Sequence, residues 1–294
     1  MQNIIFQIEG GLGKSIMGTA VVEGLAKKYP KDNIIVLTSY PAVFLGNPYV
    51  HRVYSHSQMN YFYQDVIENK QIKAFLHNPY QETSYITQSE HLLETWFAMF
   101  DIKYRGEQPQ LFINQREIAF YSKGFISQAK KPIMVIQTNG GAENQQIKYS
   151  WMRDLPVQTA QQVVDYFKDD YTIFHIRRND QIQLQNTIQA QGDFRSLCAL
   201  ISIAQKRLFI DSFAQHAAKA MGLNSVVCWI GNSPAQFGYE TNVNIMANSE
   251  TRKPELQNAR FTKYNISGDP LEFPYNDESE IFNASTIIDK LMLV

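Results

Sequence analysis

Short apolar runs alternate with amphipathic stretches from the start of the chain. Asn3–Ile8 and Asn33–Thr38 are rich in Ile, Val, Leu and Phe, a composition that is typical of buried strands. Between them, glycines at 10–13 form a turn, and the apolar residues that follow recur at helical spacing, which predicts a helix over about 14–29. A strand, a turn, a helix and a second strand in this order form a parallel βαβ unit. The pattern therefore predicts that an α/β domain opens the chain.

The alternation continues through the first half of the chain and is interrupted once. Segment 122–132 is polar and rich in lysine, and a new apolar run begins at Ile133. We therefore place a domain boundary there and expect two domains, residues 1–128 and 129–294. The other elements predicted in the first domain are strands at 50–54, 73–77 and 110–114 and helices at 59–69 and 88–100.

The second half repeats the pattern of the first. In both halves the regular alternation of strands and helices indicates a Rossmann-like, doubly wound parallel sheet. A short amphipathic helix is predicted at 286–294, with room for it to pack back on the N-terminal domain. The other elements predicted here are strands at 133–137, 171–176, 207–211 and 225–230 and helices at 159–167, 194–204 and 212–221.

The turn after the first strand reads Gly10-Gly11-Leu12-Gly13-Lys14-Ser15. Free backbone N–H groups and the helix dipole favour an anion at such a place. One interpretation is the P-loop of an ATPase. The standard spacing, however, needs a glycine where this chain has Ile8, and the looser variant of partition-type ATPases has a lysine where it has Glu9. Another interpretation is that the glycines only permit a tight turn from strand to helix.

The order of further motifs resembles glycosyltransferase family 9, the bacterial heptosyltransferases of lipopolysaccharide assembly. Asn47-Pro48-Tyr49-Val50 follows the second strand, as a similar segment does in that family. In the second half, a glycine-containing loop at 137–142 precedes Lys148 and Trp151. Segment 211–222 is similar to the family signature D-S-G-x-x-H-x-A-x-A-x-G, and the segment 229–234 after it resembles the family's next strand and turn. The resemblance covers roughly residues 3–240 in the family's order.

The resemblance implies the GT-B fold, in which two Rossmann-like, doubly wound domains face each other across a cleft. It further implies that the first domain binds the acceptor and the second a nucleotide-sugar donor, with no metal and no other cofactor. The expected activity is transfer of the sugar, with inversion, to a hydroxyl of a glycan or of a lipid-linked, lipopolysaccharide-like acceptor. A metal-free transferase has to neutralise the departing diphosphate with positive side chains and backbone donors.

Several residues of the second half are expected at the donor. By the resemblance, Lys148 contacts the diphosphate, Asp211 bonds hydroxyls of the sugar and His216 faces the same pocket. The sequence places Asp211 and Ser212 between a strand and a helix, where N–H groups point at an anion, and Arg153 could add positive charge. More ordinary roles are a helix N-cap for Asp211-Ser212 and a satisfied core histidine for His216. The glycines expected near the diphosphate are Gly11, Gly13, Gly140 and Gly141, the last two with a plain turn as the alternative.

The chain also departs from the family pattern. Lys14 stands where heptosyltransferases carry the aspartate thought to act as general base. A lysine at a helix N-terminus is disfavoured by the dipole, so we expect Lys14 to meet an anion, either donor phosphate or a phosphorylated acceptor. Glu9 is the expected replacement base, unless it is a solvated loop carboxylate or a partner of Lys14. Phe213 replaces a glycine of the signature and is expected to narrow or reshape the donor pocket. Arg177 and Arg178 replace an acidic residue near the ribose, where they could hold phosphate, stack on a base or form a solvated turn.

Composition narrows the function classes. The chain has 27 Lys and Arg against 28 Asp and Glu, a balance that argues against nucleic acid as a partner. Cys198 and Cys228 show no C-x-x-C spacing and have no histidine nearby at ligand spacing, so we expect two reduced core thiols. No apolar run is long enough to span a bilayer, so we expect a cytosolic protein with room for peripheral membrane contact. The alternatives that stay open are a DNA-base glycosyltransferase of GT-B type, a partition-type P-loop ATPase and a non-catalytic sugar- or nucleotide-binding relative.

Overall fold

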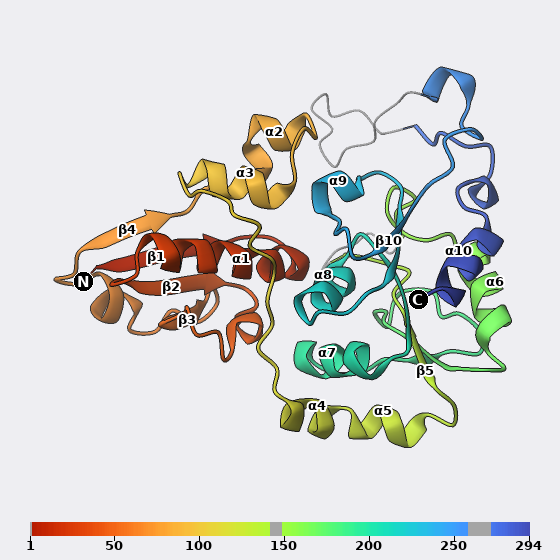
Figure 1. Cartoon of the computed structure of the whole chain (residues 1–294), viewed down its shortest axis with the longest axis horizontal. Helices are drawn as coiled ribbons and strands as arrows, with labels where there is room; N and C mark the ends of the chain where they lie inside the picture. The colour runs from red at the N-terminus through yellow and green to blue at the C-terminus, as the bar shows by residue number, and fades with distance from the viewer. Residues whose placement is uncertain (1, 142–148, 258–271) are drawn as a thin grey trace. The chain divides into compact units, whose positions relative to one another are not determined.

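The structure is a computed structural model that describes residues 2–141, 149–257 and 272–294. The chain divides into two compact units, Met1–Asn114 and Gln115–Val294 (Figure 1). Each unit is an α/β domain built on a parallel sheet. The α/β class and the Rossmann-like sheets predicted from the sequence are therefore confirmed.

The sheet of the first unit has the strand order β3-β2-β1-β4. Residues Asn3 to Ile8 of β1 pair with Asn33 to Thr38 of β2, and β4 pairs with the other edge of β1, so β1 lies inside the sheet. Its strands are β1 (Asn3–Ile8), β2 (Asn33–Thr38), β3 (Arg52–Ser55) and β4 (Ile72–Phe75), and its helices are α1 (Leu12–Lys28), α2 (Thr83–Ile86) and α3 (Leu92–Met99), with short helical turns at Pro41–Phe44, Tyr63–Ile67 and Pro79–Gln81.

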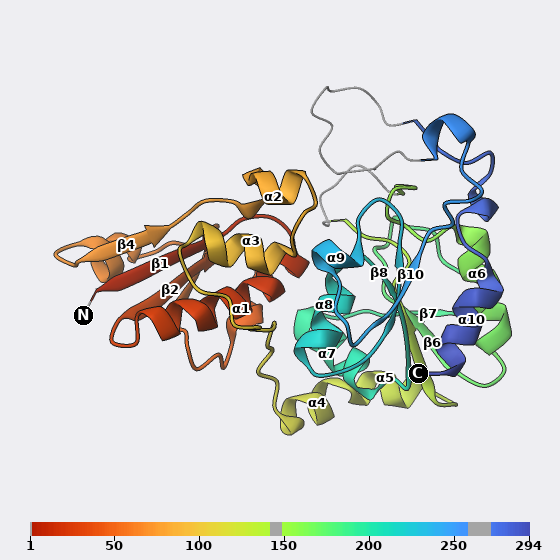
Figure 2. The same ribbon diagram turned by 45° about the horizontal axis from the view of Figure 1, so that its top comes forward.

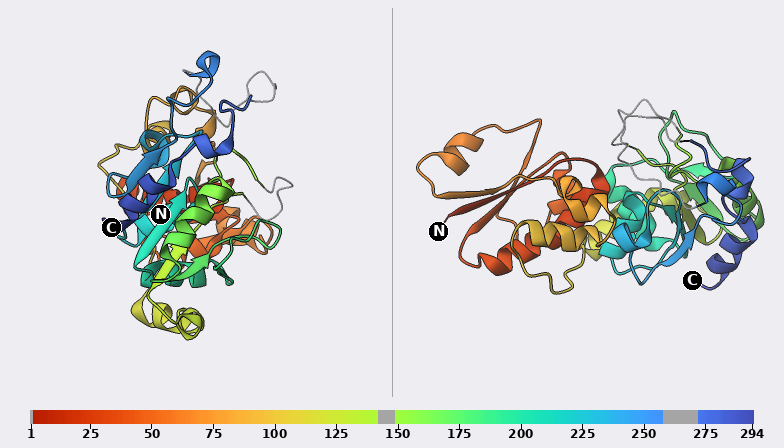
Figure 3. Two further views of the ribbon diagram at one scale, coloured as in Figure 1. Left: turned by 90° about the vertical axis from the view of Figure 1, so that its right-hand side faces the viewer. Right: turned by 90° about the horizontal axis from the view of Figure 1, so that it is seen from above.

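The two faces of this sheet are covered by different segments. Alternate residues of β1 point to opposite faces, and Phe6 meets the ring of Trp96 on α3 at 5.4 Å. Ile5 packs instead with Val66, which belongs to the crossover between β3 and β4. The right panel of Figure 3 shows this orange crossover and the red helix α1 on opposite sides of the strands. The sheet is therefore wound on both faces.

The sheet of the second unit has the order β10-β9-β8-β5-β6-β7, and its paired strands are all parallel. Numbered from β5, this is the 3-2-1-4-5-6 order of a doubly wound Rossmann sheet. Its strands are β5 (Ile133–Ile136), β6 (Thr172–His175), β7 (Ile188–Gln189), β8 (Lys206–Ile210), β9 (Val226–Trp229) and β10 (Val243–Met246), and its helices are α4 (Gln115–Tyr121), α5 (Lys123–Gln128), α6 (Val157–Phe167), α7 (Phe194–Ile203), α8 (Phe213–Ala220), α9 (Pro234–Phe237) and α10 (Ala284–Met292), with short turns at Pro254–Leu256 and Glu278–Glu280.

Helices cover both faces of this second sheet. Helices α6 and α10 pack together on one face, where Ile287 and Leu291 of α10 belong to the core (Figure 2). Helices α7 and α8 pack against each other, and α4 packs on α7. Both cysteines are buried and unpaired, as predicted, and burial raises the pKa of each thiol above its ordinary value.

The structure places the domain boundary earlier in the chain than the sequence predicts. The second unit begins at Gln115 and not at residue 129, because α4 packs on α7 and Arg195 pairs with Glu117 at 2.8 Å. Helix α10 packs on α6 within its own unit.

Two elements of the first unit also differ from the prediction. Segment 110–114 forms no strand, and in segment 59–69 only Tyr63–Ile67 is helical. In segment 59–69, Val66 is a core residue and Phe62 packs beside it. The spacing of these apolar residues in the sequence also fits a longer helix, so the pattern alone did not reveal the shorter one. Within the described ranges, no helix combines the length and apolar character that a membrane span requires.

Candidate active site

Each sheet has one point at which the chain reverses its direction of winding. In the first unit this point lies between β1 and β4, and in the second between β5 and β8. In open α/β sheets, ligands bind outside the carboxyl ends of the strands at this point, because the loops diverge there and leave a crevice. Some of the residues predicted from sequence fall at these points, among them Glu9 after β1, Gly140 after β5 and Asp211 after β8.

At the switch point of the first unit, the turn after β1 carries Glu9 and Gly10 and leads into α1. Gly10 has a positive φ of 98°, which a glycine adopts without strain, and Gly11 is the N-cap of α1. The Glu9 side chain is exposed, and its Oε1 accepts a hydrogen bond from Gln7 Nε2 at 2.7 Å. Gly13 lies in the first turn of α1. The carboxylate of Glu9 is thus open to solvent at the end of β1.

Lys14 is buried, with only 5% of its surface exposed, although its side chain ends in an amine. The amine Nζ donates a hydrogen bond to Asn78 Oδ1 at 2.6 Å. This bond links α1 to the loop after β4 across the switch point. The rings of Tyr80 and Trp96 lie 4.6 and 5.4 Å from Nζ. Burial lowers the pKa of Lys14 to about 8, and the negative charge of Glu9 has a smaller effect in the opposite direction, raising this pKa. Lys14 is therefore held by an amide and two aromatic faces, and no anion is needed to fix its position.

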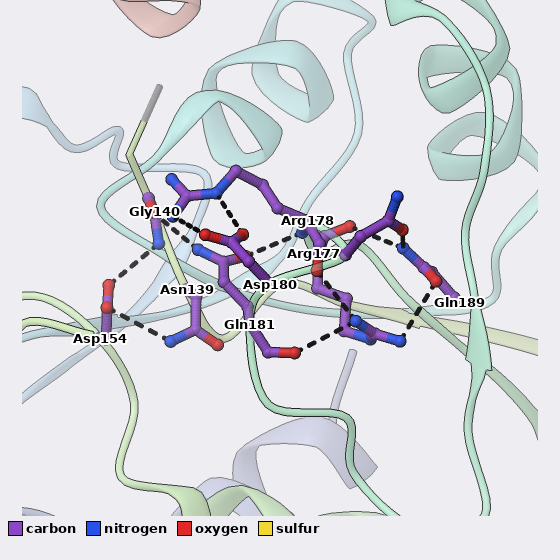
Figure 4. A network of polar contacts seen from close by, with 9 residues as sticks. Asn139, Gly140, Asp154, Arg177, Arg178, Asp180, Gln181 and Gln189 are labelled. Carbon is purple, nitrogen blue, oxygen red and sulfur yellow. Dashed lines mark hydrogen bonds and ion pairs between the residues drawn. The ribbon is translucent and has the colours of Figure 1, made fainter. Parts of the chain in front are cut away.

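At the switch point of the second unit, the loop after β5 runs through Thr138, Asn139 and Gly140. It is fixed by Asp154, a carboxylate that is only 1% exposed. Asp154 accepts hydrogen bonds from Gly140 N at 2.9 Å and from Asn139 Nδ2 at 3.3 Å (Figure 4). It also accepts one from Ser150 N at 2.9 Å. Gly141, which follows, has a positive φ of 101°. Gly140 and Gly141 thus lie in a loop at the carboxyl end of β5 whose conformation is fixed by Asp154.

Strand β8 ends at the same place. Asp211 and Ser212 follow it, and Ser212 is the N-cap of α8 without a capping bond from its side chain. Gln137 at the end of β5 accepts a hydrogen bond from the backbone N–H of Ala214 at 3.3 Å, which ties the start of α8 to β5. Asp211 accepts from Asn232 Nδ2. Among the described residues, this arrangement brings Gly140, Asp211 and Ser212 to one end of one sheet, as the sequence predicts.

His216 lies in a different environment from the expected one. It is 4% exposed, and its Nδ1 lies 2.7 Å from the hydroxyl of Tyr239, with Gln215 also in contact. This is the environment of a satisfied buried histidine, the ordinary role that the sequence left open. Lys148 lies outside the described residues.

Arg177 and Arg178 are engaged within their own loop (Figure 4). Arg177 donates from Nη1 to the carbonyl oxygens of Arg178 and Gln181 at 2.9 and 3.1 Å. Arg178 pairs with the carboxylate of Asp180, with Nε at 2.9 Å and Nη2 at 3.3 Å from its oxygens. Gln181 in turn donates to the carbonyl of Gly140 at 3.1 Å, so this loop supports the glycine loop.

Sequence reasoning missed the residues that hold the site together. Asn78 fixes Lys14, Asp154 fixes Gly140, and Gln137 fixes the start of α8. Asn78 follows directly after the predicted strand at 73–77, and Gln137 is the last residue of the predicted strand at 133–137, which is a signal that could have found them. Asp154 has no such signal. The described residues contain no group of three or more His, Cys, Asp or Glu side chains placed to hold a metal ion.

Comparison with known proteins gives a likeness in fold. No protein-family model and no curated protein sequence matches the chain. Among solved structures, a glycosyl transferase family 9 protein from Veillonella parvula DSM 2008 is similar with a TM-score of 0.70 and 13% identity, over 99% of this chain and 96% of that one.

Two further structures are similar. Escherichia coli ADP-heptose lps heptosyltransferase II gives a TM-score of 0.62 at 11% identity, over 84% of this chain and 90% of that one. The iron-containing dodecameric glycosyltransferase TibC from enterotoxigenic E. coli H10407 gives 0.66 at 13% identity, over 99% of this chain and 75% of that one. The chain therefore has the fold of heptosyltransferases, the GT-B class expected from the sequence.

Proposed function

We propose that the protein is a glycosyltransferase that moves a sugar from a nucleotide-sugar donor to a hydroxyl of a glycan or lipid-linked, lipopolysaccharide-like acceptor, with inversion and without a metal ion. The observation that carries the proposal is the likeness in fold to a family 9 glycosyltransferase over 99% of the chain, combined with polar groups at both switch points. A Rossmann sheet alone would support many activities, so the proposal depends on these groups as well as on the fold.

We place the donor at the second unit. Structures of two similar proteins contain ADP and ADP-D-beta-D-heptose, which makes a nucleotide sugar the appropriate class of donor to test. The loop at Gly140 and Gly141 and the start of α8 at Ser212 supply backbone N–H groups to an anion such as a diphosphate. Asp211 supplies a carboxylate for sugar hydroxyls, and Phe213 sets the shape of the site beside it.

We place the acceptor at the first unit and assign the chemistry to Glu9 and Lys14. Glu9 takes the proton of the acceptor hydroxyl as its oxygen attacks the anomeric carbon, and the bond to the nucleoside diphosphate breaks with the electron pair leaving on the phosphate oxygen. Lys14 offsets negative charge of a bound phosphate. The exposure of Glu9 suits a base that has to reach a substrate, and the buried amine of Lys14 suits an electrostatic role.

Ser15 argues against the ATPase alternative. In a P-loop the equivalent hydroxyl binds magnesium, whereas here Ser15 is 1% exposed and its Oγ lies 3.1 Å from Thr38 Oγ1. The hydroxyl that a P-loop would direct at magnesium is thus occupied inside the first unit.

A panel of ligands tests the proposed function. We expect a UDP-, GDP- or ADP-sugar to raise the melting temperature of the protein in the presence of EDTA, because binding to the folded state alone stabilises it. ATP with magnesium as the sole stabilising ligand would favour the ATPase instead. Binding of a nucleotide sugar without any turnover on candidate acceptors would favour the non-catalytic relative, and a gel shift with modified duplex DNA would favour a DNA-base transferase.

Glu9→Gln is expected to lower the rate of transfer by roughly 10²- to 10⁴-fold, the contribution of a general base, because glutamine cannot accept the proton. Binding of the donor should stay unchanged, since Glu9 does not contact it in the proposal. The measurement is kcat with the identified substrate pair, with titration of the donor alongside. Glu90→Gln, at an exposed carboxylate of the same unit, is the matched control. Full activity of Glu9→Gln would show that another group is the base.

A further inference from the structure

A tight turn at 150–154 bridges two strands of the second sheet that are not neighbours. On one side, Leu155 N donates to Thr138 O at 2.9 Å, beyond the end of β5. On the other, Gly231 N donates to Met152 O at 2.8 Å, beyond the end of β9. The turn is therefore attached to the carboxyl ends of both strands.

Strand β8 lies between β5 and β9 in this sheet. Met152 and Leu155 are thus attached on either side of β8. Arg153, which lies between them in the chain, is therefore placed near the carboxyl end of β8, where Asp211 and Ser212 begin the connection to α8.

The side chain of Arg153 lies directly on the glycine loop. A methyl group added to Gly140 would lie 2.5 Å from Arg153 Nε and 2.6 Å from Cζ, which is closer than a Cβ atom comes to another heavy atom in proteins. Gly140 therefore permits the guanidinium to rest against the backbone of the loop. The arginine is held over the same end of the sheet as the groups to which we assign the donor.

The guanidinium of Arg153 is also less engaged than the other arginines near the loop. Its Nε lies 3.5 Å from Asp154 Oδ1, a weak contact, and that carboxylate already accepts hydrogen bonds from two backbone N–H groups. Arg177 and Arg178 use their terminal nitrogens within their own loop. In the part of the chain that the structure describes, Arg153 Nη1 and Nη2 make no hydrogen bond or ion pair, and the side chain is 22% exposed.

We propose that Arg153 binds the diphosphate of the donor through its two terminal nitrogens. This inference rests on the proposed function and adds a residue to it. A guanidinium offers two parallel N–H donors that match the oxygens of a phosphate, and its charge persists at every working pH. As the nucleoside diphosphate leaves, negative charge grows on its oxygens, and Arg153 offsets this charge from the side of the glycine loop.

Calorimetric titrations of inorganic pyrophosphate and of UDP, GDP and ADP test the role of Arg153. Arg153→Met should weaken binding of pyrophosphate and of the preferred nucleoside diphosphate by about 10- to 100-fold and flatten the salt dependence of binding, because one charged contact is lost. Arg153→Lys should retain part of the affinity. The corresponding nucleoside, which has no phosphate, should bind the variants and the wild type equally. Arg116→Met, at an exposed arginine of α4, should leave all affinities unchanged.

The outcomes separate the inference from the proposed function. If folded Arg153→Met and Arg153→Lys bind pyrophosphate and the nucleoside diphosphate as tightly as the wild type, Arg153 is not a diphosphate ligand, although the glycosyltransferase proposal stands. An equal loss of nucleoside binding would also overturn the inference, since it would reveal a structural role for the side chain. If the wild type binds none of these nucleotides or their sugars, the proposed function fails and the inference fails with it.

Discussion

Lys14→Met is expected to abolish sugar transfer and, at the same time, to stabilise the protein. Burial lowers the pKa of Lys14 from its ordinary value of 10.5 to about 8, so the folded state at neutral pH holds a charged amine at a cost. A pKa shift of this size corresponds to roughly 3 kcal/mol of folding free energy lost to the burial of the charge. We expect Lys14→Met, in which methionine fills the same space, to raise the free energy of unfolding by about 1–3 kcal/mol. Asn78 Oδ1 keeps a partner in the variant, because it also accepts from Tyr80 N at 3.1 Å.

The pH dependence provides a second signature of Lys14. Between about pH 8 and 10.5 the unfolded chain binds the proton of Lys14 more tightly than the folded protein does, so the free energy of unfolding of the wild type should rise with pH in this window. Lys14→Met should lack this rise. Urea denaturation at several pH values measures both effects, and a Lys14→Met protein that is less stable than the wild type at pH 7 would contradict them.

Lys206→Met is the matched control for a buried lysine. Lys206 Nζ donates to the carbonyl oxygen of Leu291 at 2.6 Å and to that of Val294 at 3.3 Å, near the end of α10. These carbonyl groups lose a donor in the variant, so we expect Lys206→Met to destabilise the protein, in contrast to Lys14→Met. Among the described residues, Lys14 Nζ makes one hydrogen bond, to Asn78, and its burial is costly. We therefore assign a function to Lys14 and not to Lys206.

Asp154→Ala is expected to destabilise the protein by about 3 kcal/mol or more and to weaken nucleotide binding more than 10-fold. The change leaves the N–H groups of Gly140 and Ser150 and the amide of Asn139 without their shared acceptor, and each unsatisfied buried donor costs about 1–3 kcal/mol. The glycine loop then loses the shape that presents it to the donor. Urea denaturation and titration of the preferred nucleoside diphosphate measure the two losses.

Asp165→Ala is the control for the loss of an aspartate in the same unit. Asp165 lies on the surface of α6, where its carboxylate pairs with Lys168 at 3.3 Å and is 46% exposed. Exposed ion pairs contribute little, so we expect a change within about 0.5 kcal/mol and unaltered binding. Equal effects of the two substitutions would show that Asp154 does not organise the loop.

The elements that the sequence predicted well are those whose signal is local. The bounds of β1 and β2 are those expected from their apolar runs, and α1 differs by two residues or fewer at each end from the predicted 14–29. Segment 110–114 is rich enough in apolar residues to suggest a strand, yet it finds no partner strand and stays irregular. Strand pairing depends on distant parts of the chain, which a run of five residues does not encode.

For the candidate site, too, local signals in the sequence identified some residues, whereas long-range contacts decided others. The sequence by itself determined two doubly wound sheets and the positions of Glu9, Gly140, Asp211 and Ser212, because each of these residues follows a strand and strand ends can be recognised from composition. The tertiary structure alone decided that Lys14 meets Asn78, 64 residues away, and that His216 is buried against Tyr239. It also decided that the turn with Arg153 is attached beyond the ends of β5 and β9, on either side of β8. These contacts arise from the order in which strands assemble into a sheet, and that order is fixed by long-range packing and not by the pattern along the chain.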